Sequence, residues 1–178
     1  MISYFYGDPH FGHANIIAHA GRPFASVEEM DAELERRYCE AVSESDTVLW
    51  VGDVSFRDTE WTRKLINRLP GRKLLCRGNH DGTVRRCLEL GFEIVTSSLA
   101  VQIAGHKVVC SHFPPAGATK DVRFPESRPP APQRGEYVLH GHTHEKERLI
   151  GRRIHVGVDA WDFCPAGWLD IVAMLAGR

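Results

Sequence analysis

The chain has 178 residues, of which 43% are hydrophobic and 25% are charged, a composition typical of one globular domain. Its net charge is -1 with histidine counted as neutral, so the overall charge favours neither a nucleic-acid-binding protein nor a membrane-surface protein. The first ten residues lack the basic start and apolar run of a signal peptide, and no apolar stretch approaches the roughly 20 residues that span a bilayer. We therefore expect a cytoplasmic protein without a membrane partner.

In the first half of the chain, apolar runs alternate with helical patterns. Ser26 and Glu29 form a capping box, and apolar residues then recur at helical spacing, which predicts a helix over residues 27–44. Three apolar runs that each stop at a glycine predict strands. The predicted strands cover residues 2–6, 47–51 and 73–77, and two further predicted helices cover residues 58–69 and 82–90.

The second half of the chain is predicted to be mostly strand, with Gly105 at a hairpin turn. Its predicted strands cover residues 93–103, 107–111, 137–140, 147–150, 153–158 and 167–175. Residues 113–135 contain six prolines and no periodicity, which predicts a long irregular loop. The two halves together predict an α/β sandwich of two packed sheets with helices outside, and we find no internal repeat or domain boundary.

The chain contains ten histidines, most of them in short motifs beside glycine and aspartate. Potential metal ligands directly follow the predicted strands, where α/β sheets bind their ligands. These residues are Asp8, His10, Asp53, Asn79, His112, His142 and His144. We expect them to converge at one edge of the sandwich. Asp8 and His10 are two positions apart, so they point the same way if the local backbone is extended. The same holds for His142 and His144.

This set of ligands contains imidazole, carboxylate and amide groups but no thiolate, which suits Mn, Fe, Zn or Co. There are enough ligands for two ions, and Asp53, in the middle of the chain order, could bridge them. Two neighbouring ions activate water and bind both the attacking and the leaving oxygen of a phosphoryl displacement. The pattern therefore predicts phosphate-ester hydrolysis.

Five motifs, in this order, resemble the motif set of the calcineurin-like metallophosphoesterases. They are Asp8-Pro9-His10, Gly52-Asp53, Gly78-Asn79-His80-Asp81, Ser111-His112 and Gly141-His142-Thr143-His144. The resemblance implies a four-layer αββα sandwich of two mixed β-sheets flanked by helices. It also implies a single metallophosphoesterase domain over residues 1–178, interrupted by the proline-rich loop at residues 113–135.

The resemblance further implies two divalent metal ions, with Mn favoured and Fe, Zn, Co or Mg as alternatives. The ligands implied for the first ion are Asp8, His10, Asp53 and His144, and those for the second are Asp53, Asn79, His112 and His142. His80 is implied to lie outside the coordination shell, where it contacts the phosphate or protonates the leaving oxygen, a role that imidazole suits near neutral pH. Asp81 is implied to orient His80.

One departure from the family pattern narrows the expected activity. Larger phosphatases of the family continue Gly-Asp into a signature with a second Asp, which the run from Gly52 to Arg57 lacks. We therefore expect a phosphodiesterase that uses a metal-bridging hydroxide with His80 assisting. The alternatives are a phosphomonoesterase, a nuclease of the same fold, and a non-catalytic scaffold, although the presence of His80 argues against the last. The near-neutral charge favours a small molecule or nucleotide as substrate.

Further residues are candidates for contact with the substrate. His13 stands beside a predicted tight turn near the first motif, and Arg57 follows the second. Basic residues that could bind phosphate are Arg77, Lys120, Arg123, Arg128 and Arg134. In contrast, His19, His106, His140 and His155 are expected to be ordinary surface or core residues. The sequence predicts no particular oligomeric state.

Overall fold

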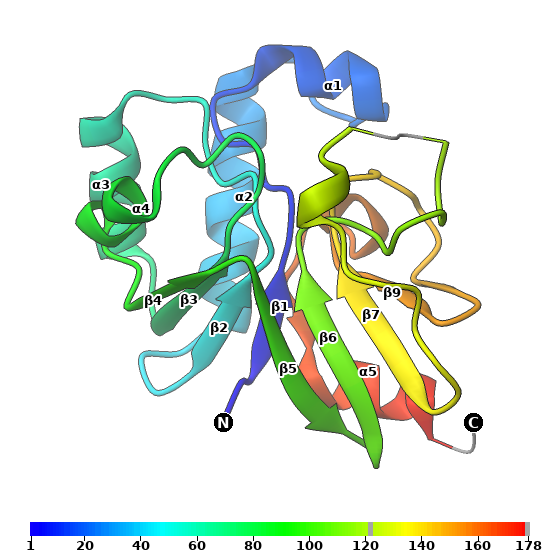
Figure 1. The fold of residues 1–178 in the computed structure, drawn as a ribbon. Helices are drawn as coiled ribbons and strands as arrows, with labels where there is room; N and C mark the ends of the chain where they lie inside the picture. Colours follow the sequence, from blue (N-terminus) through cyan, green and yellow to red (C-terminus); the bar gives the residue numbers. More distant parts are fainter. Residues whose placement is uncertain (121–122, 177–178) are drawn as a thin grey trace.

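Two five-stranded sheets form the centre of the fold in the computed structural model, which describes residues 1–120 and 123–176 (Figure 1). The first sheet has the order β10-β1-β2-β3-β4, in which β1 to β4 are parallel and β10 is antiparallel to β1. Its strands are β1 (Tyr4–Tyr6), β2 (Thr47–Trp50), β3 (Arg72–Cys76), β4 (Ile94–Thr96) and β10 (Ala166–Gly167).

The second sheet has the order β5-β6-β7-β9-β8. Its central strands β6, β7 and β9 are parallel, and the edge strands β5 and β8 are antiparallel to their neighbours. The strands are β5 (Ser98–Ile103), β6 (His106–Ser111), β7 (Glu136–His140), β8 (Leu149–Ile150) and β9 (Arg153–His155). Ala104 and Gly105, both with positive φ, make the predicted hairpin turn between β5 and β6.

Most of the helices belong to the first half of the chain, and one lies near its end. They are α1 (Ala14–Ala20), α2 (Val27–Ala41), α3 (Thr59–Arg68), α4 (Val84–Leu90) and α5 (Trp168–Leu175), with short 3-10 helices at Pro125–Ser127 and Val158–Ala160. None of the helices in the described part of the chain is long and apolar enough to cross a membrane. The predicted α/β fold of two mixed sheets with helices packed against them is confirmed.

Two apolar clusters hold these layers together. In the first, Leu34 and Tyr38 of α2 are fully buried against Trp50 of β2, together with side chains of α3 and α4. The second lies between the two sheets and includes Leu49 of β2 and Leu139 of β7. Burial of apolar side chains of this size stabilises a fold by about 1.5–3 kcal/mol each. The sheets are therefore fixed relative to each other, and so are the loops at their strand ends.

The predicted helix over residues 27–44 is present as α2 and begins as the sequence indicates. Ser26 Oγ accepts a hydrogen bond from the Glu29 N–H at 3.1 Å, and the Glu29 carboxylate accepts one from the Ala25 N–H at 2.7 Å. The first bond is that of the predicted capping box, whereas the Glu29 carboxylate binds the residue before the N-cap instead of Ser26 itself. The helix ends at Ala41, three residues earlier than predicted.

The prediction of a strand over residues 167–175 is wrong, because this segment is helix α5. Its apolar side chains fall at helical spacing, and Ile171 and Leu175 are fully buried in the cluster between the sheets. The short helix α1 was not predicted. The proline-rich segment is irregular as predicted, apart from the turn at Pro125–Ser127. Residues 121 and 122 of this segment lie outside the described residues, as do residues 177 and 178 at the end of the predicted domain.

Candidate metal centre

The loops that carry the predicted metal ligands leave the sheets at one edge, which is the upper edge in Figure 1. Asp8 and His10 follow β1, Asp53 follows β2, and Asn79 follows β3 in the first sheet. In the second sheet, His112 directly follows β6, and His142 and His144 follow β7. The structure thus brings together all seven predicted ligands from both sheets, as parallel strands with a common direction require.

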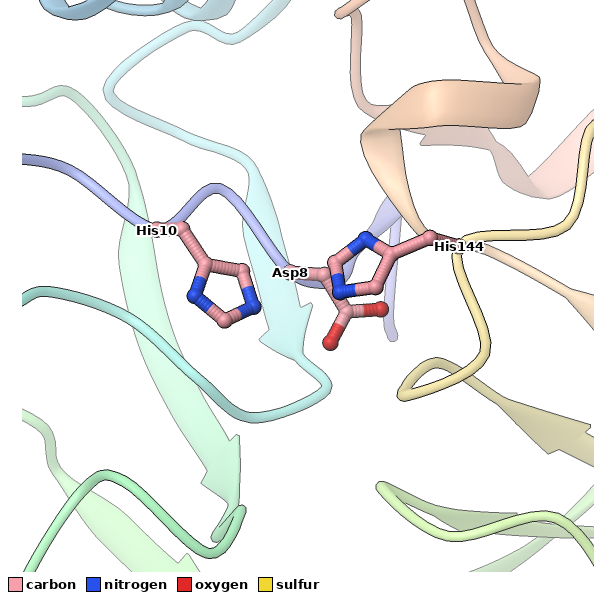
Figure 2. A group of neighbouring side chains, drawn as sticks. All are labelled: Asp8, His10 and His144. Atoms are coloured by element: carbon pink, nitrogen blue, oxygen red, sulfur yellow. The ribbon is translucent and has the colours of Figure 1, made fainter. Parts of the chain in front are cut away.

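A first group of ligands consists of Asp8, His10 and His144. Each offers a ligand atom within 4.8 Å of those of the other two, and Figure 2 shows the three side chains facing a common space. Asp8 Oδ1 and His10 Nε2 are buried and have no hydrogen-bond partner among the described residues. Leaving buried polar atoms unpartnered costs about 1–3 kcal/mol each. A divalent cation would satisfy both atoms, so these residues fit a metal ion.

A second group consists of Asp53, His112 and His142, again with ligand atoms within 4.8 Å of one another. His112 Nε2 lies 3.1 Å from His142 Nδ1, 3.1 Å from Asn79 Oδ1 and 3.5 Å from Asp53 Oδ2. Imidazole, amide and carboxylate groups that converge in this way match the ligand set of a borderline or hard divalent metal. The second group therefore also fits a metal ion.

The Asp53 carboxylate lies between the two groups. Its Oδ2 is 3.7 Å from Nε2 of His10, in the first group, and 3.5 Å from Nε2 of His112, in the second. Its Oδ1 accepts a hydrogen bond from the His80 backbone N–H at 3.0 Å. One carboxylate oxygen thus faces ligands of both groups.

Hydrogen bonds fix which ring nitrogen two of the histidines present to the site. Nδ1 of His112 lies 3.0 Å from the Val51 carbonyl oxygen, so it donates its proton there and leaves the Nε2 lone pair for a metal. Nδ1 of His144 lies 2.8 Å from Asp159 Oδ2, which leaves Nε2 of His144 for the first group in the same way. A hydrogen bond at the other ring nitrogen orients a metal-binding imidazole in this way.

Two residues that support the site, Asp159 and its partner Arg22, were not predicted from the sequence. Arg22 is buried and donates to both carboxylate oxygens of Asp159, at 2.9 and 3.0 Å. It also donates to the backbone oxygens of Asp8, at 2.7 Å, and Pro9, at 2.8 Å. Burial alone would raise the pKa of Asp159, but the hydrogen bonds from His144 and Arg22 outweigh it and hold that pKa well below its usual value. Because the two residues are 137 positions apart, no local pattern links them.

The backbone at the site is held in an uncommon conformation. Five of the predicted ligands have a positive φ between 51° and 69°: Asp8, His10, Asp53, His142 and His144. The left-handed region costs a residue with a side chain roughly 1–2 kcal/mol, and such strain concentrates at functional sites. The backbone at the two i, i+2 pairs is therefore not extended, although the side chains of each pair still reach the site.

Motif glycines allow backbone segments to approach the ligands closely. A Cβ on Gly141 would lie 2.3 Å from Asp8 Oδ2, and one on Gly52 would lie 2.3 Å from His112 Nδ1. Side chains at these positions would displace the ligands. The glycines of the Gly52-Asp53 and Gly141-His142 motifs therefore have a steric role beside the metal ligands.

Without a cation, the site disfavours charge on its own residues. Burial, and then the neighbouring Asp53 carboxylate, raises the pKa of Asp8 well above its usual value. Burial, and then the charge of His144, lowers the pKa of His10. A bound divalent cation would oppose the shift of Asp8, because it stabilises the ionised carboxylate, and it would add to the shift of His10, because it binds the neutral imidazole.

His80 and Asp81 differ in where they lie. The His80 side chain is 47% exposed, lines the open cleft, and has its Nε2 4.0 Å from Asp53 Oδ2. The buried Asp81 carboxylate instead accepts hydrogen bonds from the N–H groups of Asp53 (3.0 Å), Val54 (2.8 Å) and Gly78 (2.6 Å). Within the described part of the chain it makes no hydrogen bond to His80. Asp81 therefore holds the loops that carry Asp53 and Asn79, rather than the His80 ring as expected.

The two candidate substrate-binding residues also differ. His13 lines the cleft, lies 3.4 Å from His10 Nδ1 through its own Nδ1, and stacks on Phe56 with ring centroids 3.9 Å apart. Arg57 does not line the cleft. Its Nε and Nη2 donate to Asp31 Oδ2 at 3.2 and 3.0 Å. Arg57 is therefore held against α2 and outside the cleft, where the predicted contact with the substrate would be made.

The cleft over the two groups has a volume of about 340 Å³. Of the basic residues considered, Arg123 lines this cleft, Arg77 lines a neighbouring pocket, and Arg128 lies over the Phe113 ring. Lys120 and Arg134 are exposed. The cleft is lined by His10, His13, Asn15, Ile16, His19, Asp53, Asn79, His80, Arg123, His142 and His144.

The histidines expected to be ordinary fall in three environments. His19 lines the cleft after all. His106 packs against Tyr137 at the far end of β6. His140 and His155 are buried, with ring centroids 5.4 Å apart, and belong to neither ligand group.

Known proteins resemble this chain in sequence and fold. The model of the calcineurin-like phosphoesterase superfamily domain matches residues 13–156. The gene 66 protein of Mycobacterium phage L5 is 32% identical over 89% of this chain and 87% of its own length. That of phage D29 is 34% identical over 89% of this chain and 88% of its own length. A protein of unknown function from Aquifex aeolicus shares the fold, with a TM-score of 0.72 at 22% identity over 97% of this chain and 98% of its own.

Proposed function

Because the chain belongs to the calcineurin-like phosphoesterase superfamily, we propose that it hydrolyses phosphodiesters with the help of two divalent metal ions. The observation that carries this proposal is the Asp53 carboxylate, which has one oxygen within 4 Å of a ring nitrogen from each ligand group. A carboxylate between two sets of metal ligands is the arrangement that a two-metal site needs.

Two ions would be held by residues already close together. Asp8, His10, His144 and Asp53 would hold the first, and Asp53, Asn79, His112 and His142 the second. Such ions supply a water of lowered pKa and neutralise charge on the phosphate oxygens. We favour Mn, with Fe, Zn, Co or Mg as alternatives, because nitrogen and oxygen ligands without a thiolate suit these metals.

The protein's own residues then position the substrate and move a proton. The water oxygen bonds to phosphorus, one phosphorus–oxygen ester bond breaks, and the products are a phosphomonoester and an alcohol. His80, on the cleft wall, would donate the proton that the leaving oxygen takes. Asp81 supports this arrangement indirectly through its hydrogen bonds to the backbone of Asp53 and Gly78.

The charge of the cleft supports a diester over a monoester. A phosphodiester carries one negative charge, whereas a phosphomonoester near neutral pH carries up to two and calls for more cationic partners. Among the described residues that line the cleft, Arg123 is the one arginine or lysine, while Arg57 is bound to Asp31 instead. We further propose that the substrate is a small molecule or nucleotide, because a net charge of -1 does not favour a polynucleotide.

The test is hydrolysis of bis-p-nitrophenyl phosphate, a diester, and p-nitrophenyl phosphate, a monoester. Protein stripped with EDTA is assayed after addition of Mn, Zn, Mg or Ca, beside an Asp53→Asn variant as control. The proposal predicts diester hydrolysis that returns with Mn and is lost in the variant. Faster hydrolysis of the monoester would instead indicate a phosphomonoesterase. No hydrolysis by a protein that binds two ions would indicate a scaffold.

A further inference from the structure

A second pocket adjoins the cleft and has a volume of about 250 Å³. Asn79, a predicted metal ligand, lines both hollows. The other walls of this second pocket come from Arg77 and from Phe113, Phe124, Glu126 and Ser127 of the proline-rich loop. A group attached to a phosphate held beside Asn79 would therefore reach this pocket directly.

One wall of the pocket is aromatic and begins at the metal ligands. The Phe113 ring packs against His112 and His142, with centroid distances of 4.9 Å to each. Phe124 extends this wall outward, 5.3 Å from Phe113. Phe124 remains 37% exposed. An exposed aromatic ring beside a pocket offers a flat face on which a planar ligand can stack.

Other residues that line the pocket offer hydrogen-bonding groups. Arg77 Nη1 donates to the Gly82 carbonyl oxygen at 2.6 Å, and no carboxylate among the described residues pairs with this guanidinium. Glu126 and Ser127 add oxygen acceptors to the same pocket. A pocket with both donors and acceptors suits a neutral group with a polar edge better than a second phosphate, which the Glu126 carboxylate would repel.

We propose that this pocket binds the nucleoside of a nucleotide diester, with the base stacked on Phe124 and its polar edge hydrogen-bonded to Arg77. This inference rests on the proposed function and names its substrate class. An aromatic face together with hydrogen-bonding groups matches how proteins hold unpaired bases. The scissile phosphate then lies over Asp53 and Asn79, and the pocket distinguishes nucleotide esters from simple alkyl esters.

Two esters with the same leaving group test the proposal in Mn-loaded protein. They are thymidine 5′-(p-nitrophenyl phosphate) and methyl p-nitrophenyl phosphate, and the readout is the ratio of their kcat/KM values. In wild type, kcat/KM for the nucleoside ester is expected to be at least about tenfold higher than for the methyl ester, which is the effect of one base-stacking contact. Phe124→Ala and Arg77→Gln should each lower this ratio severalfold, whereas Phe124→Tyr should retain it. Leu88→Ala, a change at an exposed residue of α4 outside the pocket, is the matched control.

A ratio near one in wild type, or a ratio unchanged by both Phe124→Ala and Arg77→Gln, would overturn the pocket assignment. Metal-dependent hydrolysis of the methyl ester would then still support the proposed function. Failure to hydrolyse either ester with any metal would overturn the proposed function and this inference together. Thermal melting of each variant checks that it is folded.

Discussion

Oδ2 of Asp159 lies 2.8 Å from Nδ1 of His144, and both oxygens of the same carboxylate accept hydrogen bonds from the buried guanidinium of Arg22. These three residues form a chain of charge-assisted hydrogen bonds behind the first ligand group. Because these hydrogen bonds keep the His144 proton on Nδ1, they leave Nε2 of His144 able to bind a metal. Arg22 also binds the Asp8 backbone, so one guanidinium supports two ligands.

Asp159→Asn should weaken metal binding without unfolding the protein. An asparagine with its oxygen in place of Oδ1 keeps the bond from Arg22 Nε, and its NH₂ group then faces Nη2 of Arg22 and Nδ1 of His144. Nδ1 of His144 must then accept, so its Nε2 carries the proton. We expect Mn affinity to fall by about 10–100-fold. Competition with a chelating dye measures this affinity. Asp162→Asn, at an exposed carboxylate nearby, is the matched control, and equal affinity in Asp159→Asn and wild type would contradict this role.

His80→Ala should separate catalysis from metal binding. The ring is half exposed at the cleft wall and belongs to neither ligand group, so its removal should leave the metal content unchanged. Loss of proton donation to the leaving oxygen should lower kcat at least about tenfold. Metal analysis and turnover of bis-p-nitrophenyl phosphate are measured on the same samples, with His106→Ala as control. A wild-type rate in His80→Ala would rule out the role proposed for His80.

Gly141→Ala tests the close approach of the backbone to Asp8. The added Cβ would lie 2.3 Å from Asp8 Oδ2, so the carboxylate must move away from its group. We expect weaker Mn binding and a loss of hydrolysis of at least about tenfold. Gly105→Ala, in the distant hairpin turn, is the control, because its positive φ makes alanine strained there while its Cβ meets no atom within 4 Å. It should lower stability by about 1 kcal/mol and keep activity.

The buried pair His140 and His155 predicts a loss of stability in acid. Burial, and then a neighbouring histidine charge, lowers the pKa of His140 to about 3 and that of His155 to about 4. In the unfolded chain both titrate near 6.5, so below this pH the unfolded state binds more protons. The free energy of unfolding should therefore fall as the pH drops from about 6.5 to 4, by up to about 1.4 kcal/mol per pH unit for each group.

His155→Phe tests this linkage, because it removes one of the two titrating groups and keeps an aromatic ring in the core. Urea unfolding in EDTA at pH values between 7 and 4 gives the free energy of unfolding of both proteins. The stability of wild type should fall relative to that of the variant by roughly 1 kcal/mol per pH unit below 6.5. Parallel curves would contradict the pKa shift of His155.

The sequence predicted the strand ends and the residues after them, because both are local features. A buried strand followed by glycine and a polar residue can be recognised from a few consecutive residues, as at Trp50, Gly52 and Asp53. The segment that forms helix α5 was predicted as a strand because most of its residues are apolar. The helix is also only eight residues long, so few helical repeats fall within it. Periodicity over eight residues discriminates poorly between a buried helix and a strand.

Other features of the site lay beyond sequence reasoning because they depend on contacts between distant residues. Nothing near Arg22 or Asp159 indicates that they meet, since the sandwich alone brings them together. The left-handed backbone at Asp8 and His10 also has no decisive local signal, because Asp and His adopt it more often than most residues but still only in a small minority of cases. The role of Asp81 was mistaken for a related reason: its neighbour in sequence is His80, but its partners in space are backbone N–H groups.

The proposed reaction requires two divalent ions that act together, held by Asp53 and the ligands on either side of it. The most direct measurement is turnover of bis-p-nitrophenyl phosphate as Mn is added in steps to metal-free protein at a concentration far above the dissociation constant. Activity is expected to rise and to level off at two equivalents of Mn per chain. Activity that is independent of metal, or that is complete at one equivalent, would contradict the requirement for two ions.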